Sequence, residues 1–240
     1  MSRAEDQTEL SMQLATTAAM RVALMHELGQ PLSAVASYIH AGRHLLQSDG
    51  FDQTLLAETM RKAETELKRA RDVVARLRTF LVCDKAQRAP VDVEELLKTV
   101  VARLQTEAGT RSVRITVDAE ALPSVPADAS QIKQVLLNLV SNAIDAAAQT
   151  GEGSVHINCR HSNGGISIEV DDNGIGIAPE IAKHLFEPFQ TTKTRGMGLG
   201  LPLSRQIVEA HGGKIWWERA VPQGTRFCVM LPTVVAFHAA

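Results

Sequence analysis

The sequence predicts an α-helical hairpin followed by an α+β layer sandwich. Apolar residues recur at three- and four-residue steps through two long segments, at about 9–46 and 54–83. From about residue 90 the pattern changes repeatedly between the period of a helix and that of a strand. The 240 residues are 45% hydrophobic but only 4% aromatic, which favours helix packing over a β-sandwich. Two domains of different architecture are therefore expected.

The two long helices should pair as a hairpin. They are separated by the polar stretch "QSDGFDQ" at 47–53. The apolar positions that define the stripes are Leu24, Leu28, Leu32, Val35 and Ile39 in the first helix, and Leu67, Ala70, Val74, Leu77 and Leu81 in the second. A slender hairpin has too little inner surface to be stable alone. We therefore expect a homodimer in which four helices from two chains close one core.

The rest of the chain alternates helices with mostly antiparallel strands. "DKAQRAP" at 84–90 is polar, ends in Pro90 and is predicted to be a linker. Asn163-Gly164 is a strong hairpin-turn signal. The predicted helices span 92–108, 128–148 and 199–211, and the predicted strands span 113–118, 154–160, 165–171, 212–219 and 224–231. This order indicates an α+β sandwich.

Charge and composition exclude several functional classes. A net charge of −2 gives no general attraction to nucleic acid or anionic lipid, so neither is expected as a partner. No apolar run approaches the roughly 20 residues needed to span a bilayer. Cys83, Cys159 and Cys228 lack the paired spacing of a disulfide framework or a zinc site. A cytoplasmic chain is expected.

Two asparagines in one predicted helix suggest a cation site. Asn138 and Asn142 in "SQIKQVLLNLVSNAIDAA" are four residues apart and so share a face. Asparagine is a poor helix former, and its carbonyl oxygen suits Mg²⁺, which takes few protein ligands and keeps phosphate and water. Two surface amides with no role remain the alternative.

Two glycine-rich stretches follow. "VDDNGIGI" ends a strand at Asp172 and continues through Gly174 and Gly176, so its carboxylate could accept a hydrogen bond from an exocyclic amine such as that of adenine. "RGMGLGL" places Gly196, Gly198 and Gly200 before a helix, where backbone N–H groups could hold phosphates. Neither stretch is a Rossmann or P-loop motif. A plain turn and an ordinary glycine loop remain the alternatives.

The order of these motifs resembles the core of a two-component sensor histidine kinase. "HELGQPL" resembles that family's histidine box, "NLVSNA" its asparagine box, "DNGIG" and "GMGLGL" its glycine boxes, and "FEPFQTTK" its phenylalanine box. The resemblance covers nearly the whole chain. "HELGQPL", "FEPFQTTK" and "VEAHGG" are similar to the versions in the nitrogen-fixation oxygen-sensor kinases.

The resemblance implies a division of labour. Residues 1–86 would be a HisKA-type dimerisation and histidine phosphotransfer domain, and 87–240 a Bergerat (GHKL) ATP-binding domain. Asn142 would bind Mg²⁺ and Asn138 the phosphates of ATP. Asp172 would take the adenine amine, with Thr225, Gly174 and Gly176 close by. Over the phosphates, Gly196, Gly198 and Gly200 would hinge a lid, Lys193 would supply a cation, and Phe186 and Phe189 would pack the lid base.

The resemblance also assigns the reaction. His26 would accept the γ-phosphoryl group of ATP and pass it to the receiver domain of a response regulator. Glu27 would assist loss of the imidazole proton. Gln30, one helical turn on, would orient a water for dephosphorylation of the regulator, where the family commonly has Thr or Asn. Asn138 stands where related ATP-hydrolysing proteins have a glutamate, and an amide cannot act as that base. A phosphotransfer scaffold without ATP binding and a Bergerat ATPase with a helical arm are the alternatives.

Overall fold

The computed structural model describes residues 25, 28–48, 52–81, 87–120, 122–162, 164–188, 190–191 and 198–233. The chain divides into two compact units. The first comprises Met1–Val82 with Pro188–Leu199, and the second comprises Cys83–Glu187 with Gly200–Ala240. Among the described residues no helix is long and apolar enough to cross a membrane.

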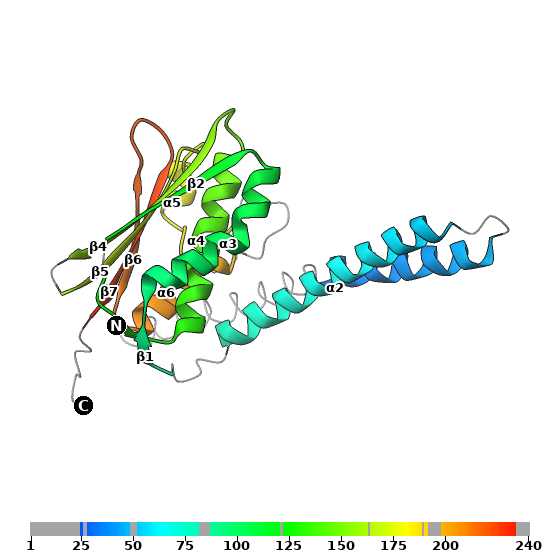
Figure 1. Cartoon of the computed structure of the whole chain (residues 1–240), viewed down its shortest axis with the longest axis horizontal. Helices are drawn as coiled ribbons and strands as arrows, with labels where there is room; N and C mark the ends of the chain where they lie inside the picture. The colour runs from blue at the N-terminus through cyan, green and yellow to red at the C-terminus, as the bar shows by residue number, and fades with distance from the viewer. Residues whose placement is uncertain are drawn as a thin grey trace, which may run out of the picture. The chain divides into compact units, whose positions relative to one another are not determined.

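The first unit contains the expected hairpin (Figure 1). Residues 28–47 form its first helix, and α2 (Gln53–Leu81) forms its second. Asp52 is the N-cap of α2, because its Oδ1 accepts hydrogen bonds from the backbone N–H groups of Thr54 and Leu55, at 2.8 and 3.0 Å. The two helices approach closely at the buried Gly42, because a Cβ there would lie 2.5 Å from Cε of Met60.

Within one chain, the apolar surface of α2 is divided between a buried and an exposed face. Ala70 and Val73 are buried, whereas Leu67 and Val74 are about half exposed. Val73 was not among the predicted stripe positions, and Leu67 and Val74 were. The reason is geometric: adjacent apolar positions 73 and 74 lie about 100° apart around a helix, so only one of them can face the same neighbour.

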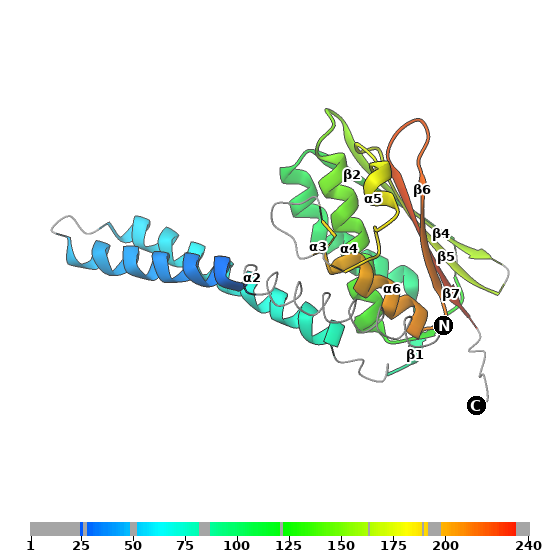
Figure 2. The same cartoon turned by 180° about the vertical axis from the view of Figure 1, so that it is seen from behind.

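The second unit is a two-layer sandwich (Figures 1 and 2). The strands of its five-stranded sheet are β2 (Val113–Ala119), β4 (Gly153–Ser162), β5 (Gly165–Asp172), β6 (Lys214–Arg219) and β7 (Thr225–Pro232). Their order in the sheet is β2-β4-β5-β7-β6. The pair β2–β4 is parallel and the other three pairs are antiparallel, so the sheet is mostly antiparallel, as predicted from the sequence.

Three helices form the second layer. The helices are α3 (Val93–Thr110), α4 (Ala129–Ala147) and α6 (Gly200–Ala210), and a short helix, α5 (Pro179–Ala182), precedes α6. Helix α3 packs on β2, α4 on β4 and β5, and α6 on β6 and β7, with α4 between the other two. Fully buried side chains from both layers, among them Leu136, Leu139, Ile157 and Ile168, form the core between them.

The predicted linker at 84–90 is partly wrong. Its last two residues belong to β1 (Ala89–Val91), which pairs antiparallel with β3 (Val125–Ala127), a strand that was not predicted at all. Proline lacks a backbone donor and normally argues against a strand. Here Pro90 and Pro126 face each other in a ribbon only three residues long, so few ladder bonds are lost.

Candidate nucleotide-binding site

Helix α4 carries two half-buried asparagines on the face that its neighbour α6 approaches. Asp128 caps the helix, and its Oδ1 accepts hydrogen bonds from the backbone N–H groups of Ser130 and Gln131. Nδ2 of Asn142 lies 3.5 Å from Oδ1 of Asn138, at the limit of a hydrogen bond. Because Nδ2 of Asn142 faces Asn138, its carbonyl oxygen points away from Asn138. This oxygen is the atom that a hard cation would bind.

The beginning of α6 is pressed against the first of these asparagines. Nδ2 of Asn138 donates to Oγ of Ser204, at 2.9 Å, and Ser204 is buried on α6. A Cβ at position 200 would collide with the Asn138 side chain, so only glycine allows this approach. The first turn of α6, where backbone N–H groups lack partners within the helix, is thereby held beside the asparagine pair.

Asp172 ends β5 with a buried carboxylate. Its Oδ1 accepts hydrogen bonds from the backbone N–H groups of Gly174, at 2.8 Å, and Thr225, at 3.3 Å. Within the described part of the chain, its Oδ2 accepts no hydrogen bond. Burial raises the pKa of this carboxyl to about 6, although the two backbone hydrogen bonds act in the opposite direction. One oxygen is therefore held by the backbone, and the other can accept a hydrogen bond from a ligand.

The surrounding turns are built for close approach. A Cβ at Gly174 would lie 2.6 Å from the carbonyl carbon of Ala146 in α4, and Gly176 has a φ of +75°. Gly224 was not predicted, yet its φ is +115° and a Cβ there would collide with the carbonyl oxygen of Asp172. Nε2 of Gln223 donates to the carbonyl oxygen of Gly174, at 3.0 Å. These contacts join the two turns that flank Asp172.

Four of the predicted site residues thus lie on three elements of the second unit. Asn138 and Asn142 lie on α4, Asp172 ends β5, and Thr225 begins β7 beside it. Sequence reasoning missed Ser204 and Gly224. Ser204 had no signal in the sequence, whereas Gly224 stands in "PQGTRF" directly before a strand, a position where a special φ is common.

The segment predicted to form a lid is described only in part. Gly198 has a φ of +62° two residues before α6. The guanidinium of Arg205 on α6 lies 4.0 Å from the centre of the Phe186 ring, so this side chain packs against α6. Lys193, Gly196 and Phe189 lie outside the described residues, and so do His26 and Glu27.

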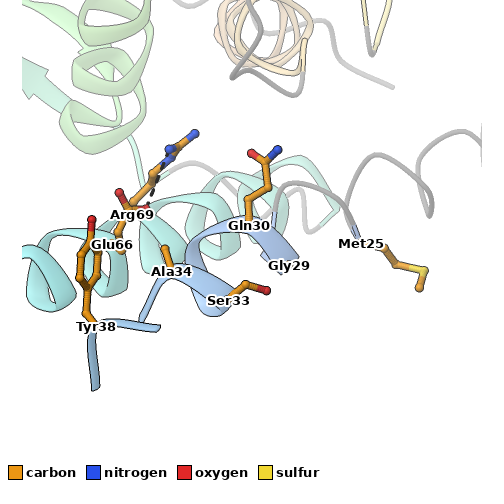
Figure 3. A pocket seen from close by; sticks show the side chains of 8 residues that line it. All are labelled: Met25, Gly29, Gln30, Ser33, Ala34, Tyr38, Glu66 and Arg69. Atoms are coloured by element: carbon orange, nitrogen blue, oxygen red, sulfur yellow. Dashed lines mark ion pairs between the residues drawn. The ribbon is translucent and has the colours of Figure 1, made fainter. Parts of the chain in front are cut away.

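Gln30 lines a groove in the hairpin (Figure 3). The groove has a volume of about 560 Å³ and is lined by Met25, Gly29, Gln30, Ser33, Ala34, Tyr38, Glu66 and Arg69. Gln30 and Arg69 extend from the two helices toward the same side, and Arg69 forms a loose ion pair with Glu66, at 3.9 Å. The groove therefore combines the amide of Gln30, four residues after position 26 in the sequence, with the phenol of Tyr38 and the guanidinium of Arg69.

The donor set fits a magnesium nucleotide better than a tightly ligated metal. Across the described ranges, no group of three or more His, Cys, Asp or Glu side chains could hold a metal ion. Mg²⁺ usually keeps water and phosphate oxygens and needs only one or two protein ligands. Asn142 on α4 could supply such a ligand, and Asp172 with its available Oδ2 fits an adenine amine.

Comparisons with known proteins identify the family of the second unit and of most of the chain. Residues 127–235 match the family described as histidine kinase-, DNA gyrase B- and HSP90-like ATPase. The chain is 34% identical to the C4-dicarboxylate transport sensor protein DctS of Rhodobacter capsulatus, over 97% of its own length and 36% of that protein. It is 36% identical to the sensor protein FixL of Bradyrhizobium diazoefficiens, over 89% of its own length and 43% of that protein.

The chain thus spans less than half the length of these two relatives. Among solved structures, the catalytic domain of histidine kinase ThkA has a TM-score of 0.56 and 32% identity, covering 61% of this chain and 96% of that one. ThkA in complex with response regulator protein TrrA has a TM-score of 0.67 and 25% identity, covering 98% of this chain and 67% of that one. The chain therefore belongs to the two-component sensor histidine kinases and carries their kinase core.

Proposed function

We propose that the chain uses Mg-ATP to phosphorylate His26 and then transfers the phosphoryl group to an aspartate of a response regulator. The observation that carries ATP binding is the buried Asp172, which has one oxygen held by the backbone and the other available to an adenine amine. Asn142 and Asn138 on α4 would face the metal and the phosphates. An ATP-driven reaction of this kind belongs in the cytoplasm.

The chemical step moves the γ-phosphoryl group from ATP to Nε2 of His26 and releases ADP. The bound Mg²⁺ would neutralise charge on the phosphates. Glu27 would accept the proton that the imidazole loses, so that the lone pair of Nε2 can form the bond to phosphorus. Asn138 lacks the basicity to activate a water, which directs the phosphoryl group to the protein instead of to hydrolysis.

Dimerisation is supported by the apolar pattern of the hairpin. In the first helix Met25, Leu32, Ile39 and Leu46 recur every seven residues and are exposed. In α2 the exposed Met60, Leu67 and Val74 do the same. A stripe with this period packs against another helix. Apolar residues three or four positions from the stripe residues, such as Val35 and Ala70, are more buried within one chain. The exposed stripes would therefore form the core of a four-helix bundle with a second copy.

The groove that contains Gln30 would receive the response regulator. It borders the turn that follows His26, and it presents both charged and polar groups. ThkA, to which this chain is similar, has been solved in complex with a response regulator protein. We propose residues 1–86 as the dimerisation and phosphotransfer domain and 87–240 as the ATP-binding domain.

Labelling with γ-phosphate-labelled ATP tests the function. Phosphate should appear on the protein in an acid-labile, alkali-stable form and should be absent from His26→Ala. Asn142→Ala should also fail to label, but for a different reason: it should bind Mg-nucleotide weakly, whereas His26→Ala should bind it normally. Labelling that survives His26→Ala would contradict the assignment.

The same experiment separates the two alternatives. A phosphotransfer scaffold would accept phosphate from a phosphorylated receiver but would not bind nucleotide. A Bergerat ATPase would release inorganic phosphate and leave none on the protein. Mixing His26→Ala with Asn142→Ala then asks whether transfer crosses the dimer, because label can appear only if ATP on one chain reaches the histidine of the other.

A further inference from the structure

The first described residues after the hairpin are fastened to two helices of the ATP-binding unit. The backbone N–H of Gln87 donates to Oδ2 of Asp128, at 3.1 Å, and the guanidinium of Arg88 donates to the carbonyl oxygen of Ala210, at 2.6 Å. Asp128 caps the beginning of α4, and Ala210 ends α6. A cation at the end of a helix is also favoured by the helix dipole.

The same two helix ends are joined to each other through His211. The backbone N–H of Asp128 donates to Nε2 of His211, at 3.0 Å, and Nδ1 of the imidazole donates to the carbonyl oxygen of Ile207, at 2.8 Å. The imidazole is buried, and each of its two ring nitrogens makes one of these hydrogen bonds. We name Gln87, Arg88, Asp128, Ala210 and His211 the linker latch.

The Asp128 carboxylate is the centre of the latch. Hydrogen bonds from the Ser130 hydroxyl, and then from the backbone N–H groups of Gln131, Gln87 and Ser130, hold the pKa of this carboxyl below its usual range. It therefore stays ionised at neutral pH and serves two purposes. It caps α4 through Oδ1 and holds the linker through Oδ2.

The helices that hold the latch are the ones that carry the nucleotide site. At the site itself, α4 and α6 are joined by the hydrogen bond from Asn138 to Ser204. At the opposite ends they are joined by the bond from Asp128 to His211. These two hydrogen bonds hold α4 and α6 together at two separate points along the helices. A linker fastened to these helices therefore fixes where the chain leaves the ATP-binding unit.

The latch also shortens the stretch of sequence between α2 and the first residue held by the ATP-binding unit. Helix α2 ends at Leu81, and six Cα–Cα steps separate it from Gln87. At about 3.3–3.6 Å per residue these steps reach roughly 20 Å. Without the latch, the first fixed residue is Ala89 of β1, and the reach becomes roughly 28 Å. Releasing Gln87 and Arg88 would therefore lengthen the tether by about a third.

We propose that Arg88 is a positioning residue for phosphorylation of His26, acting through the linker latch. The proposal rests on the proposed function and deepens it. By fastening the linker, Arg88 limits the volume that the ATP-binding unit explores around the phosphoacceptor. A shorter and directed tether raises the effective concentration of bound ATP at the histidine without changing how ATP binds.

The test compares four full-length proteins: wild type, Arg88→Ala, Arg88→Lys and Arg114→Ala. Arg114 is an exposed arginine on β2 outside the latch and serves as the matched control. Arg88→Ala should lower the kcat of autophosphorylation about 1.5-fold to 2.5-fold, as expected for a tether of eight steps in place of six, while the Kd for a non-hydrolysable ATP analogue stays the same within error. Arg88→Lys should restore most of the rate, because an ammonium can also donate to the Ala210 carbonyl.

Hydrogen exchange gives a readout that does not depend on activity. The Gln87 amide should exchange slowly in the wild type and in Arg114→Ala, and faster in Arg88→Ala. If the wild type showed this protection but no autophosphorylation, the proposed function would fail and the latch would stand as a structural contact. Equal kcat in wild type and Arg88→Ala, a higher kcat in Arg88→Ala, or a parallel loss of nucleotide affinity would each overturn the positioning role.

A second variant isolates tether length. Inserting Gly-Ser between residues 84 and 85 lengthens the connection by two residues and leaves every latch residue in place. It should lower kcat about as much as Arg88→Ala while the Gln87 amide remains protected. An unchanged rate in the insertion variant would mean that tether length does not limit the reaction, and the proposal would be wrong.

Discussion

Nδ2 of Asn138 and Oγ of Ser204 form a hydrogen bond of 2.9 Å that joins α4 to α6 at the nucleotide site. We propose that Asn138 stands where related ATP-hydrolysing proteins have a catalytic base, and its amide is oriented by a serine on α6. The amide can make this contact because residue 200, at the beginning of α6, is glycine. The phosphate side of the site therefore depends on the packing of two helices and on one missing Cβ.

Gly200→Ala should weaken nucleotide binding. The added methyl group would collide with Oδ1 of Asn138 and force the amide to move, which would break the bond to Ser204. We expect about tenfold weaker binding of Mg-ATP, equivalent to about 1.4 kcal/mol, measured by calorimetry. The matched control is Gly151→Ala, where a Cβ meets nothing within 4 Å. Equal affinities in the two variants would show that the close approach is unimportant for binding.

Asp172 should make nucleotide affinity depend on pH. Burial raises the pKa of its carboxyl to about 6, and only the ionised group is a full acceptor for the adenine amine. Affinity should therefore fall as pH decreases below about 6, by up to about tenfold per pH unit. Asp172→Asn should bind weakly with a flat profile between pH 5 and 8. A parallel pH dependence in this variant would assign the titration to another group.

The same carboxyl should affect stability in the opposite direction. A folded-state pKa above the ordinary carboxyl value of 3.8 means that the folded protein binds the proton more tightly than the unfolded chain. This contribution to the free energy of unfolding is present below about pH 4 and is lost as pH rises through about 6, a change of about 3 kcal/mol. The difference between wild type and Asp172→Asn in thermal melts without nucleotide isolates it. A constant difference from pH 4 to 7 would rule it out.

Much of this site could be predicted because its residues lie in short motifs. Asn138 and Asn142 share a helix face by spacing alone, and Asp172 stands at a recognisable end of a strand. Ser204 could not be predicted, since its role depends on a helix 66 residues away. Gly224 carries a special φ, but its relation to Asp172 depends on the pairing of β5 with β7.

The errors in the fold have a similar origin. We did not predict β1 and β3, because Pro90 and Pro126 argue against strands. Such short strands form because they pair with a distant segment and not because of local propensity. In α2 the predicted stripe omitted Val73, whose side chain is buried. Periodicity identifies apolar positions, but it does not say which of two adjacent ones, Val73 or Val74, faces the neighbouring helix.

Ile39→Glu should separate the proposed dimer. Ile39 is half exposed in the seven-residue stripe of the first helix, so a homodimer would bury it in both copies. Two unpaired carboxylates would then be buried for each dimer, which should raise the dimer Kd at least about 100-fold. Light scattering should show a monomer at micromolar concentration that still binds nucleotide. Ser37→Glu is the control, because Ser37 is exposed and lies outside the stripe. A wild-type monomer would refute the interface.

Glu27 and Gln30 should divide the chemistry around His26. Glu27→Gln removes the proposed base, so it should keep nucleotide affinity and lose about 10²- to 10⁴-fold in the rate of autophosphorylation. Gln30 lines the hairpin groove and cannot act as a base. Gln30→Ala should therefore keep autophosphorylation and slow dephosphorylation of the phosphorylated regulator, because a water is no longer oriented. Rates of the two half-reactions are measured separately for each variant, with circular dichroism as a check on helix content. If either single change slowed both half-reactions equally, the helix would be damaged and the roles would not be divided.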